Sequence, residues 1–365
     1  MEKQPLDTSL DRRAFLRSTG ALVLGASLVG RASRSLAADV PAPALSSPSG
    51  KALRGLYPIL QTPFTPENKL DGEALAGEVR FCNRGRLGGM IWPVFASSWS
   101  TLSDAERIEG AETILAAGAG GEAAIAIAVQ NNAWDPAVSV RYAKHAAAHG
   151  ADALVAIPPN NGWNVSDQAV VDYYRTIGSA TDLPLIVQTR GTVSVDLLVR
   201  ISQEVPTVRA TKDEVGDPLK RIPEILRRTK GKLAVWAAGG GTGNLLLEEL
   251  PPGFAGLCPT PQYSDLLQQV MELYWAGKKG EAFDMFGRVQ GFAAIAGATE
   301  YLMVAREVFQ ETTTFRPQPM EPEARPAGAG RRGAGGLRDT EPASAAQKAF
   351  IRQALETYLR PYLRA

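Results

Sequence analysis

Short apolar runs alternate with longer amphipathic stretches through most of this chain. Runs of this length, bounded by turn residues, predict β-strands. The predicted strands cover, in order, residues 56–62, 89–95, 123–129, 153–157, 184–189, 208–212, 233–238 and 253–258. Helical periodicity follows the first six and the eighth of these strands, over residues 71–82, 103–117, 135–149, 166–179, 194–204, 218–228 and 262–276.

The predicted strands are apolar throughout, which is typical of parallel sheets with both faces covered. Eight such strands, most of them followed by a helix, predict an α/β fold, a (β/α)8 TIM barrel over residues 53–276. A doubly wound open sheet is the alternative. It requires a glycine-rich turn after the first strand, and Gln61-Thr62-Pro63-Phe64 is not such a turn.

A C-terminal helical appendage follows the predicted barrel, over residues 277–365. Helical patterns cover residues 278–296, 299–311 and 345–363. Between the last two, residues 312–342 are rich in Pro, Gly and Arg and predict a flexible insertion. We expect the appendage to pack on the barrel or to form oligomer contacts.

The N-terminus has the pattern of an export signal. Arg12-Arg13 precedes Phe15-Leu16, an apolar run covers residues 19–30, and small residues follow at 35–38. Paired arginines are typical of the twin-arginine route. We therefore predict a cleaved signal over residues 1–38, a linker over 39–52 and a periplasmic protein. An uncleaved anchor is the alternative, but the run is shorter than the roughly 20 residues that span a bilayer.

Composition excludes several classes of protein. Hydrophobic residues make up 45% of the 365, which excludes global disorder. The 39 basic and 38 acidic residues give a net charge of +1, which offers no case for nucleic-acid binding. Cys82 and Cys258 have no metal-like spacing. No other stretch predicts a transmembrane span.

Lys212 ends the sixth predicted strand, in the run Val208-Arg209-Ala210-Thr211-Lys212. In a TIM barrel the carboxyl ends of the strands carry the chemistry. A desolvated lysine has a lowered pKa, so its neutral amine becomes available to attack a carbonyl. We predict that Lys212 forms a Schiff base with a carbonyl substrate. The alternative is a solvated lysine at the end of a strand.

Polar residues follow several of the other predicted strands, and these are the candidates for substrate binding. Ser97 and Ser98 follow the second strand and offer hydroxyls, and Arg190 offers a guanidinium for a substrate carboxylate. Gly240, in a glycine-rich turn after the seventh strand, offers backbone N–H groups to an anion, although such turns are also simply tight turns. The remaining amides are Gln130, Asn131, Asn132, Asn160 and Asn161, which could equally be polar loop tips.

Two acids and two histidines complete the candidates. Asp213 and Glu214 follow Lys212 and could act as acid–base groups or cap the next helix. His145 and His149 are spaced i, i+4 on a predicted helix, which is compatible with zinc. No third ligand is evident in the sequence and the helix belongs on the outside of the barrel, so we predict no metal and no cofactor.

Several segments together carry a family resemblance. They are Thr62-Pro63-Phe64 with Leu70-Asp71, Thr101-Leu102-Ser103-Asp104-Ala105-Glu106-Arg107, His149-Gly150-Ala151-Asp152-Ala153-Leu154, Pro158-Pro159 and Thr211-Lys212-Asp213. Their order resembles the dihydrodipicolinate synthase / N-acetylneuraminate lyase family of Schiff-base barrel enzymes, over residues 53–274. The resemblance implies a TIM barrel, a Schiff base on Lys212, a small-molecule 2-oxo acid or sugar acid as substrate, and a homo-oligomer.

The chain departs from the family pattern at three places. Phe95 and Ala96 stand where the family has two threonines that help to hold the substrate carboxylate, and Asn161 stands where it has a proton-relaying tyrosine. Gln188-Thr189-Arg190 replaces its usual turn after strand five. We predict an exported lyase or aldolase with an altered pocket. The alternative is a non-catalytic metabolite-binding barrel derived from the same family.

Overall fold

A computed structural model describes residues 45–238, 254–296, 299–316 and 343–364 of the protein. The chain divides into two compact units, residues 1–39 and 40–365, and the first lies wholly outside the described residues. The predicted signal, part of the linker, Gly240 and residues 317–342 of the predicted insertion therefore have no structural description here.

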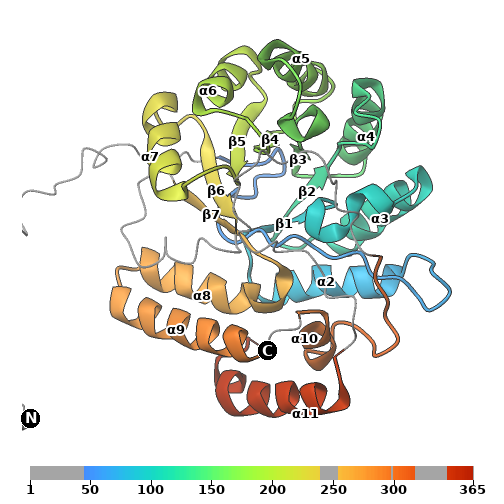
Figure 1. Ribbon diagram of the computed structural model, residues 1–365, viewed down its shortest axis with the longest axis vertical. Helices are drawn as coiled ribbons and strands as arrows, with labels where there is room; N and C mark the ends of the chain where they lie inside the picture. The colour runs from blue at the N-terminus through green and yellow to red at the C-terminus, as the bar shows by residue number, and fades with distance from the viewer. Residues whose placement is uncertain (1–44, 239–253, 297–298, 317–342, 365) are drawn as a thin grey trace, which may run out of the picture. The chain divides into compact units, whose positions relative to one another are not determined.

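Seven parallel strands form one sheet in sequence order, β1 to β7 (Figure 1). Each corresponds to a predicted strand, and its bounds differ from the prediction by three residues at most. Their bounds are β1 Gly89–Trp92, β2 Ala124–Ala128, β3 Ala153–Ala156, β4 Leu185–Gln188, β5 Val208–Asp213, β6 Ala234–Ala238 and β7 Phe254–Cys258.

The first predicted strand, residues 56–62, is not a regular strand, and this expectation was wrong in detail. The segment is extended, and its backbone bonds to both edges of the sheet. The amide of Tyr57 donates to Leu257 O at 2.9 Å, and that of Leu60 donates to Ile91 O at 3.0 Å. Pro58 has no amide hydrogen, which interrupts the pairing with β1. The segment nevertheless occupies the eighth position and closes the barrel.

A helix follows the segment 56–62 and each strand except β6, whose following residues 239–253 are not described, and these helices pack outside the barrel (Figure 1). The bounds are α2 Gly72–Arg84, α3 Asp104–Ala117, α4 Pro136–Ala148, α5 Asp167–Gly178, α6 Val195–Glu204, α7 Pro218–Thr229 and α8 Ser264–Trp275. Strand residues of one face, such as Ile125, pack with the helices, and those of the other face, such as Ala126, form a second core inside the barrel. This is the (β/α)8 architecture.

Asp152 closes the end of the barrel at which the strands begin. Its side chain is 1% exposed and accepts from Lys51 Nζ at 3.1 Å, from Ser49 Oγ at 2.5 Å and from the amide of Ile125 at 2.9 Å. The N-terminal segment is thereby held against the start of β3. The opposite end, where the strands finish, is the barrel mouth.

Three helices follow the barrel: α9 Lys279–Ala296, α10 Thr299–Ala305 and α11 Ala345–Ala354. Helix α9 packs on α8 and α11 packs on α9 (Figure 1). Helix α10 is shorter than the predicted 299–311, because the backbone turns at Glu307 with φ of 60°. The predicted helix 345–363 continues beyond α11 only as a π-helical turn, Leu355–Leu359, and a short 3-10 turn. None of the described helices has the length and apolarity needed to cross a bilayer.

Candidate active site

Lys212 lies on β5 with its side chain inside the barrel. Side chains alternate along a strand, and Ala210, two residues earlier, belongs to the interior core. Lys212 is 2% exposed, and its Cα pairs with those of Gln188 on β4 and Trp236 on β6. This placement agrees with the predicted position at the barrel mouth. It does not agree with the alternative, a lysine exposed to solvent at the end of a strand.

The Lys212 ammonium is paired with Glu214. Its Nζ contacts Oε1 of Glu214, and the side chain of Glu214 is 18% exposed. Glu214 continues the alternation of β5 by two residues, which directs it to the same side as Lys212. Gln188 Nε2 donates to the other carboxylate oxygen, Oε2, at 2.5 Å. A lysine and a carboxylate thus share one inward-facing, hydrogen-bonded site.

Burial by itself raises the pKa of Glu214. The positive charges of Lys212 and Arg190, with hydrogen bonds from Lys212 and Gln188, outweigh burial and hold that pKa below its ordinary value. Glu214 is therefore ionised near neutral pH. Arg190 follows β4, and its guanidinium lies 4.3 Å from the ring centroid of Phe95. The cation predicted for a substrate carboxylate lies within electrostatic reach of the Lys212–Glu214 pair.

Two buried amide oxygens at the mouth have no hydrogen-bond partner among the described residues: Oε1 of Gln130 and Oε1 of Gln188. Each side chain is held through its nitrogen, since Gln130 Nε2 donates to Pro93 O at 2.8 Å and Gln188 Nε2 donates to Glu214. Leaving a buried acceptor unpaired costs about 1–3 kcal/mol. These oxygens are suited to accept hydrogen bonds from the hydroxyls of a bound polar molecule.

Cys258 ends β7 and is buried inside the barrel. Burial raises the pKa of its thiol to about 12, with the Lys212 ammonium lowering it and Glu214 raising it by smaller amounts. Cys258 belongs to the same interior core as Ala210 and Trp236, the neighbours of Lys212. Its high pKa keeps it a neutral thiol, so it lines the site and is not a nucleophile there.

Asp213 faces away from the barrel interior and anchors β5 to its surroundings. Its carboxylate accepts from both Nε and Nη2 of Arg221 on α7, each at 2.9 Å, and from Thr189 Oγ1 at 2.9 Å. The N-cap of α7 is Asp217, so neither Asp213 nor Glu214 has the predicted capping role. Asp213 is a positioning group for the strand that carries Lys212.

Ser97 and Ser98 lie in the turn after β1, and the fold uses both hydroxyls. Ser97 is fully buried, donates to Leu60 O at 2.5 Å and accepts from the amide of Val94 at 3.2 Å. Ser98 donates to Arg316 O at 2.7 Å. A substrate contact from either hydroxyl would replace one of these bonds.

Asn160 and Asn161 lie side by side in the turn after β3, and both have positive φ, 49° and 55°. Asn160 is exposed, whereas Asn161 is 4% exposed. Asparagine tolerates this left-handed conformation better than most residues. The two amides therefore shape the turn, and Asn161 is the one that the fold encloses.

The amides predicted after the third strand separate in the same way. Asn131 Nδ2 donates to Asp135 O and Ser139 Oγ, and Asn132 Nδ2 donates to Ser100 O. These bonds fix the loop before α4. Gln130 alone continues the inward-facing register of Ala126 and Ala128, two residues apart along β2.

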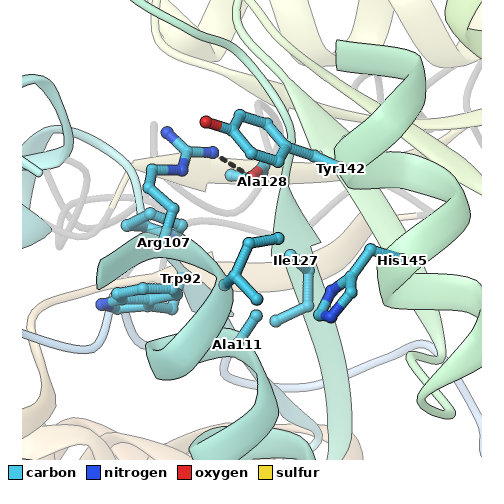
Figure 2. A pocket seen from close by; sticks show the side chains of 9 residues that line it. Trp92, Arg107, Ala111, Ile127, Ala128, Tyr142 and His145 are labelled. Atoms are coloured by element: carbon cyan, nitrogen blue, oxygen red, sulfur yellow. Dashed lines mark hydrogen bonds between the residues drawn. The ribbon is translucent and has the colours of Figure 1, made fainter. Parts of the chain in front are cut away.

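A separate hollow lies between α3 and α4 on the outer side of the sheet (Figure 2). Its lining residues are Trp92, Pro93, Arg107, Ile108, Ala111, Ile127, Ala128, Tyr142 and His145, none of which belongs to the mouth. Arg107 spans it and donates to Ala128 O at 2.6 Å. The hollow is thus a feature of the helix layer.

The architecture and the inward-facing lysine define a TIM-barrel protein with a buried amine at its mouth. Residues 52–312 match the model of the Dihydrodipicolinate synthetase family, and the chain belongs to that family. The predicted resemblance is confirmed.

Two related sequences show the degree of divergence. The 4-hydroxy-tetrahydrodipicolinate synthase of Haloarcula marismortui is 29% identical over 208 residues, 55% of this chain and 65% of that protein. The "Probable 2-dehydro-3-deoxy-D-pentonate aldolase" of Escherichia coli is 27% identical over 174 residues, 46% of this chain and 56% of that protein. The matched part spans less than two thirds of each relative.

The fold is also shared with solved structures. The N-acetylneuraminate lyase of Mycoplasma synoviae superposes with a TM-score of 0.67 and covers 84% of this chain and 98% of its own. The two are 17% identical. At that identity the likeness concerns the barrel and not the residues of the site.

Proposed function

We propose that the protein is a Schiff-base lyase of aldolase type, acting on a 2-oxo acid or sugar acid. The observation that carries the proposal is the buried Lys212–Glu214 pair inside the barrel mouth. An isolated buried ammonium is costly, and so is an isolated carboxylate. A chain that keeps both in this position has a lysine and a proton acceptor in contact.

Attack on a carbonyl requires the neutral amine, and Glu214 supplies the base. The carboxylate takes a proton from the Lys212 ammonium, and the amine then adds to the carbonyl carbon to give a carbinolamine. Glu214, now protonated, returns the proton to the carbinolamine hydroxyl, which leaves as water. The product is an iminium on Lys212 and an ionised Glu214. The iminium withdraws electrons from the adjacent carbon, which allows a carbon–carbon bond to break.

Arg190 is the proposed partner of the substrate carboxylate, since a guanidinium can bind a carboxylate through two hydrogen bonds. Gln130 and Gln188 are proposed to accept from substrate hydroxyls through their unpaired oxygens. These groups would replace the two threonines and the tyrosine that the chain lacks. A polyhydroxylated 2-oxo acid suits this set of donors and acceptors.

Reductive trapping tests the lysine. The protein is incubated with single 2-oxo acids, including pyruvate and 2-oxo sugar acids, treated with borohydride and weighed intact. We expect one adduct per chain, located on Lys212 by peptide mapping, and no adduct in Lys212→Ala. Lys220 is an exposed lysine on α7, and Lys220→Ala is the matched control. This variant should form the adduct to the same extent as the wild type. An adduct on other lysines only would refute the proposal.

Glu214→Gln tests the proton acceptor. Removing a general acid–base group typically costs about 10²–10⁴ in rate. We expect trapping by Glu214→Gln to be slower by that order and to recover as pH rises, because solvent must then deprotonate the ammonium. Stopped-flow mixing with a trapped 2-oxo acid measures the rate. An unchanged rate and pH profile would leave Glu214 with no role in proton transfer.

The second candidate is a non-catalytic barrel that binds the same class of metabolite. The Lys212–Glu214 contact also favours it, because an ion pair stabilises the unreactive ammonium. It predicts that a 2-oxo sugar acid raises the melting temperature with no adduct and no turnover. Ligand-induced stabilisation that persists in Lys212→Arg, together with failed trapping, would select this function.

Export by the twin-arginine route and assembly into a homo-oligomer are also proposed, from the sequence pattern and the family. We propose no nucleic-acid partner, on the near-zero net charge. Light scattering of the mature protein tests the oligomer. A mass of one chain at micromolar concentration would reject it.

A further inference from the structure

Three metal-ligating side chains meet on the outer surface of the barrel, between α3 and α4. Glu112 comes from α3, His145 from the last turn of α4, and His149 is the residue that ends α4. One ligand atom from each lies within 4.8 Å of the others. Glu112 is the third ligand that the sequence did not reveal, because α3 and α4 are separated by a strand in the chain.

Both imidazoles face the same carboxylate oxygen. Nε2 of His145 lies 2.9 Å from Glu112 Oε1, and Nε2 of His149 lies 3.8 Å from the same atom. The ring centroids are 4.1 Å apart, as i, i+4 spacing on one helix face allows. Side-chain exposures of 19% for His145 and 44% for His149 leave the group open to an ion from solvent.

A hydrogen bond fixes the tautomer of His149 that a metal requires. Its Nδ1 lies 2.8 Å from the backbone oxygen of His145. A carbonyl oxygen only accepts, so Nδ1 carries the proton and Nε2 keeps a free lone pair. Metal-ligating histidines commonly hold their second nitrogen in this way. In the neutral imidazole Nε2 is therefore the nitrogen that can bind an ion, and it lies 3.8 Å from Glu112 Oε1.

The surroundings favour a cation and hold the ligands in place. The two rings lie at the C-terminal end of α4, where the helix dipole attracts positive charge. His145 also lines the hollow beside Tyr142 and Ile127, and Figure 2 shows its ring against the strand β2. The guanidinium of Arg107 is 4.7 Å from the centroid of the Tyr142 ring, which packs the wall of that hollow.

We propose that Glu112, His145 and His149 bind one transition-metal cation of the zinc type. Two imidazole nitrogens and one carboxylate oxygen are ligands that Zn²⁺ prefers, and water completes the tetrahedron. Bond lengths of about 2.0–2.1 Å require these atoms to approach within roughly 3.3 Å of one another, so the partly exposed side chains of Glu112 and His149 must both rotate when the ion binds. The ion displaces the proton between His145 Nε2 and Glu112. It cross-links α3 and α4 and takes no part in the proposed Schiff-base chemistry.

The composition of the chain makes this site simple to test. The protein has two histidines, and both are in the proposed site. Its two cysteines are buried, one on α2 and one on β7. Imidazole ligation detected in mature protein that carries no histidine tag must therefore come from His145 and His149.

Calorimetric titration with ZnCl₂ and pulsed electron paramagnetic resonance with Cu²⁺ provide two readouts. We expect one ion per chain, nitrogen coupling from two imidazoles, and a higher melting temperature with Zn²⁺. His149→Gln should keep one imidazole coupling, and Glu112→Gln should keep both. Loss of a residue that only supports a ligand typically costs about 10–100-fold in metal affinity, so loss of a ligand should cost each variant at least as much. The Zn²⁺-dependent rise in melting temperature should disappear as well.

Glu109 is an exposed acid one turn earlier on α3, and Glu109→Gln is the matched control. This variant should bind Zn²⁺ with the affinity of the wild type. Absence of binding at 100-fold molar excess of Zn²⁺ would overturn the proposal. So would equal affinity in wild type and His149→Gln. Because trapping on Lys212 is measured separately, failure of the metal site leaves the proposed function untouched.

Discussion

At the scale of single residues, the contact between Lys212 and Glu214 decides the chemistry. The two side chains are two residues apart on a strand, so the alternation of β5 directs both inward. The same alternation turns Asp213 outward, where it binds Arg221. Two adjacent acids that look alike in the sequence therefore have different tasks. One meets the amine and the other anchors the strand.

The lowered pKa of Glu214 gives a prediction for acid stability. The folded pKa is below the unfolded value of about 4.3, so this group stabilises the protein above pH 4.3 and loses that effect as pH falls through the folded pKa. We expect the difference in unfolding free energy between wild type and Glu214→Gln to shrink as pH is lowered from 6 to 3. Urea titrations measure it. The exposed Glu73→Gln serves as control. A pH-independent difference would contradict the assignment.

The thiols give a second prediction at this scale. Burial raises the pKa of Cys258 to about 12 and that of Cys82 well above its ordinary value. The thiolate is the reactive form, so neither thiol should react with dithionitrobenzoate at pH 8 in the folded protein. Both should react in denaturant. One equivalent released from the folded protein would contradict the burial of one of the two thiols.

At the scale of elements, a buried ion pair joins Arg306, the residue after α10, to Asp265 on α8. Arg306 donates to Asp265 at 2.8 and 2.5 Å, and the two side chains are 6% and 2% exposed. Removing one partner of a buried pair leaves the other charge buried without compensation. We expect Asp265→Asn to lower the free energy of unfolding by about 3 kcal/mol. Asp284→Asn, on the exposed side of α9, is the control, and equal stability of the two variants would argue against the pair.

The elements themselves were largely predictable. Strands β1 to β7 and helices α2 to α9 lie within a few residues of the periodic patterns, because apolar alternation and helical spacing are local properties. The errors fall where a distant partner intervenes. Residues 56–62 depart from a strand at Pro58, and side chains from α2 and α8 accept the amides of Gln61 and Leu56. No local pattern specifies those two bonds.

At the scale of the whole molecule, the sequence predicts export, and that prediction can be tested directly. Arg12→Lys with Arg13→Lys keeps the charge but removes the paired arginines. We expect this variant to remain in the cytoplasm of a host with twin-arginine transport, whereas Arg17→Lys should be exported. Immunoblots of cell fractions show the location. Equal export of both variants would reject the route.

The candidate site was partly predictable. Lys212, Arg190 and Gln130 were expected at strand ends, and β5, β4 and β2 bring them to one mouth. The roles of Gln188 and Cys258 were missed, because the sequence of an apolar run does not show whether a given side chain faces the barrel interior or the outer helices. The inward alternation from Lys212 was the signal that could have separated Glu214 from Asp213.

The sequence alone determined the barrel, its family and the position of the lysine, because periodicity and motif order are written along the chain. Only the tertiary structure decided what surrounds that lysine. Gln188 ends β4 and Glu214 follows β5, so their hydrogen bond joins two neighbouring parts of the sheet. Glu112 likewise lies on a different helix from His145 and His149, so the sequence did not show that the three side chains meet. Neighbours that are distant in the chain are set by strand register and helix packing, which no local pattern encodes.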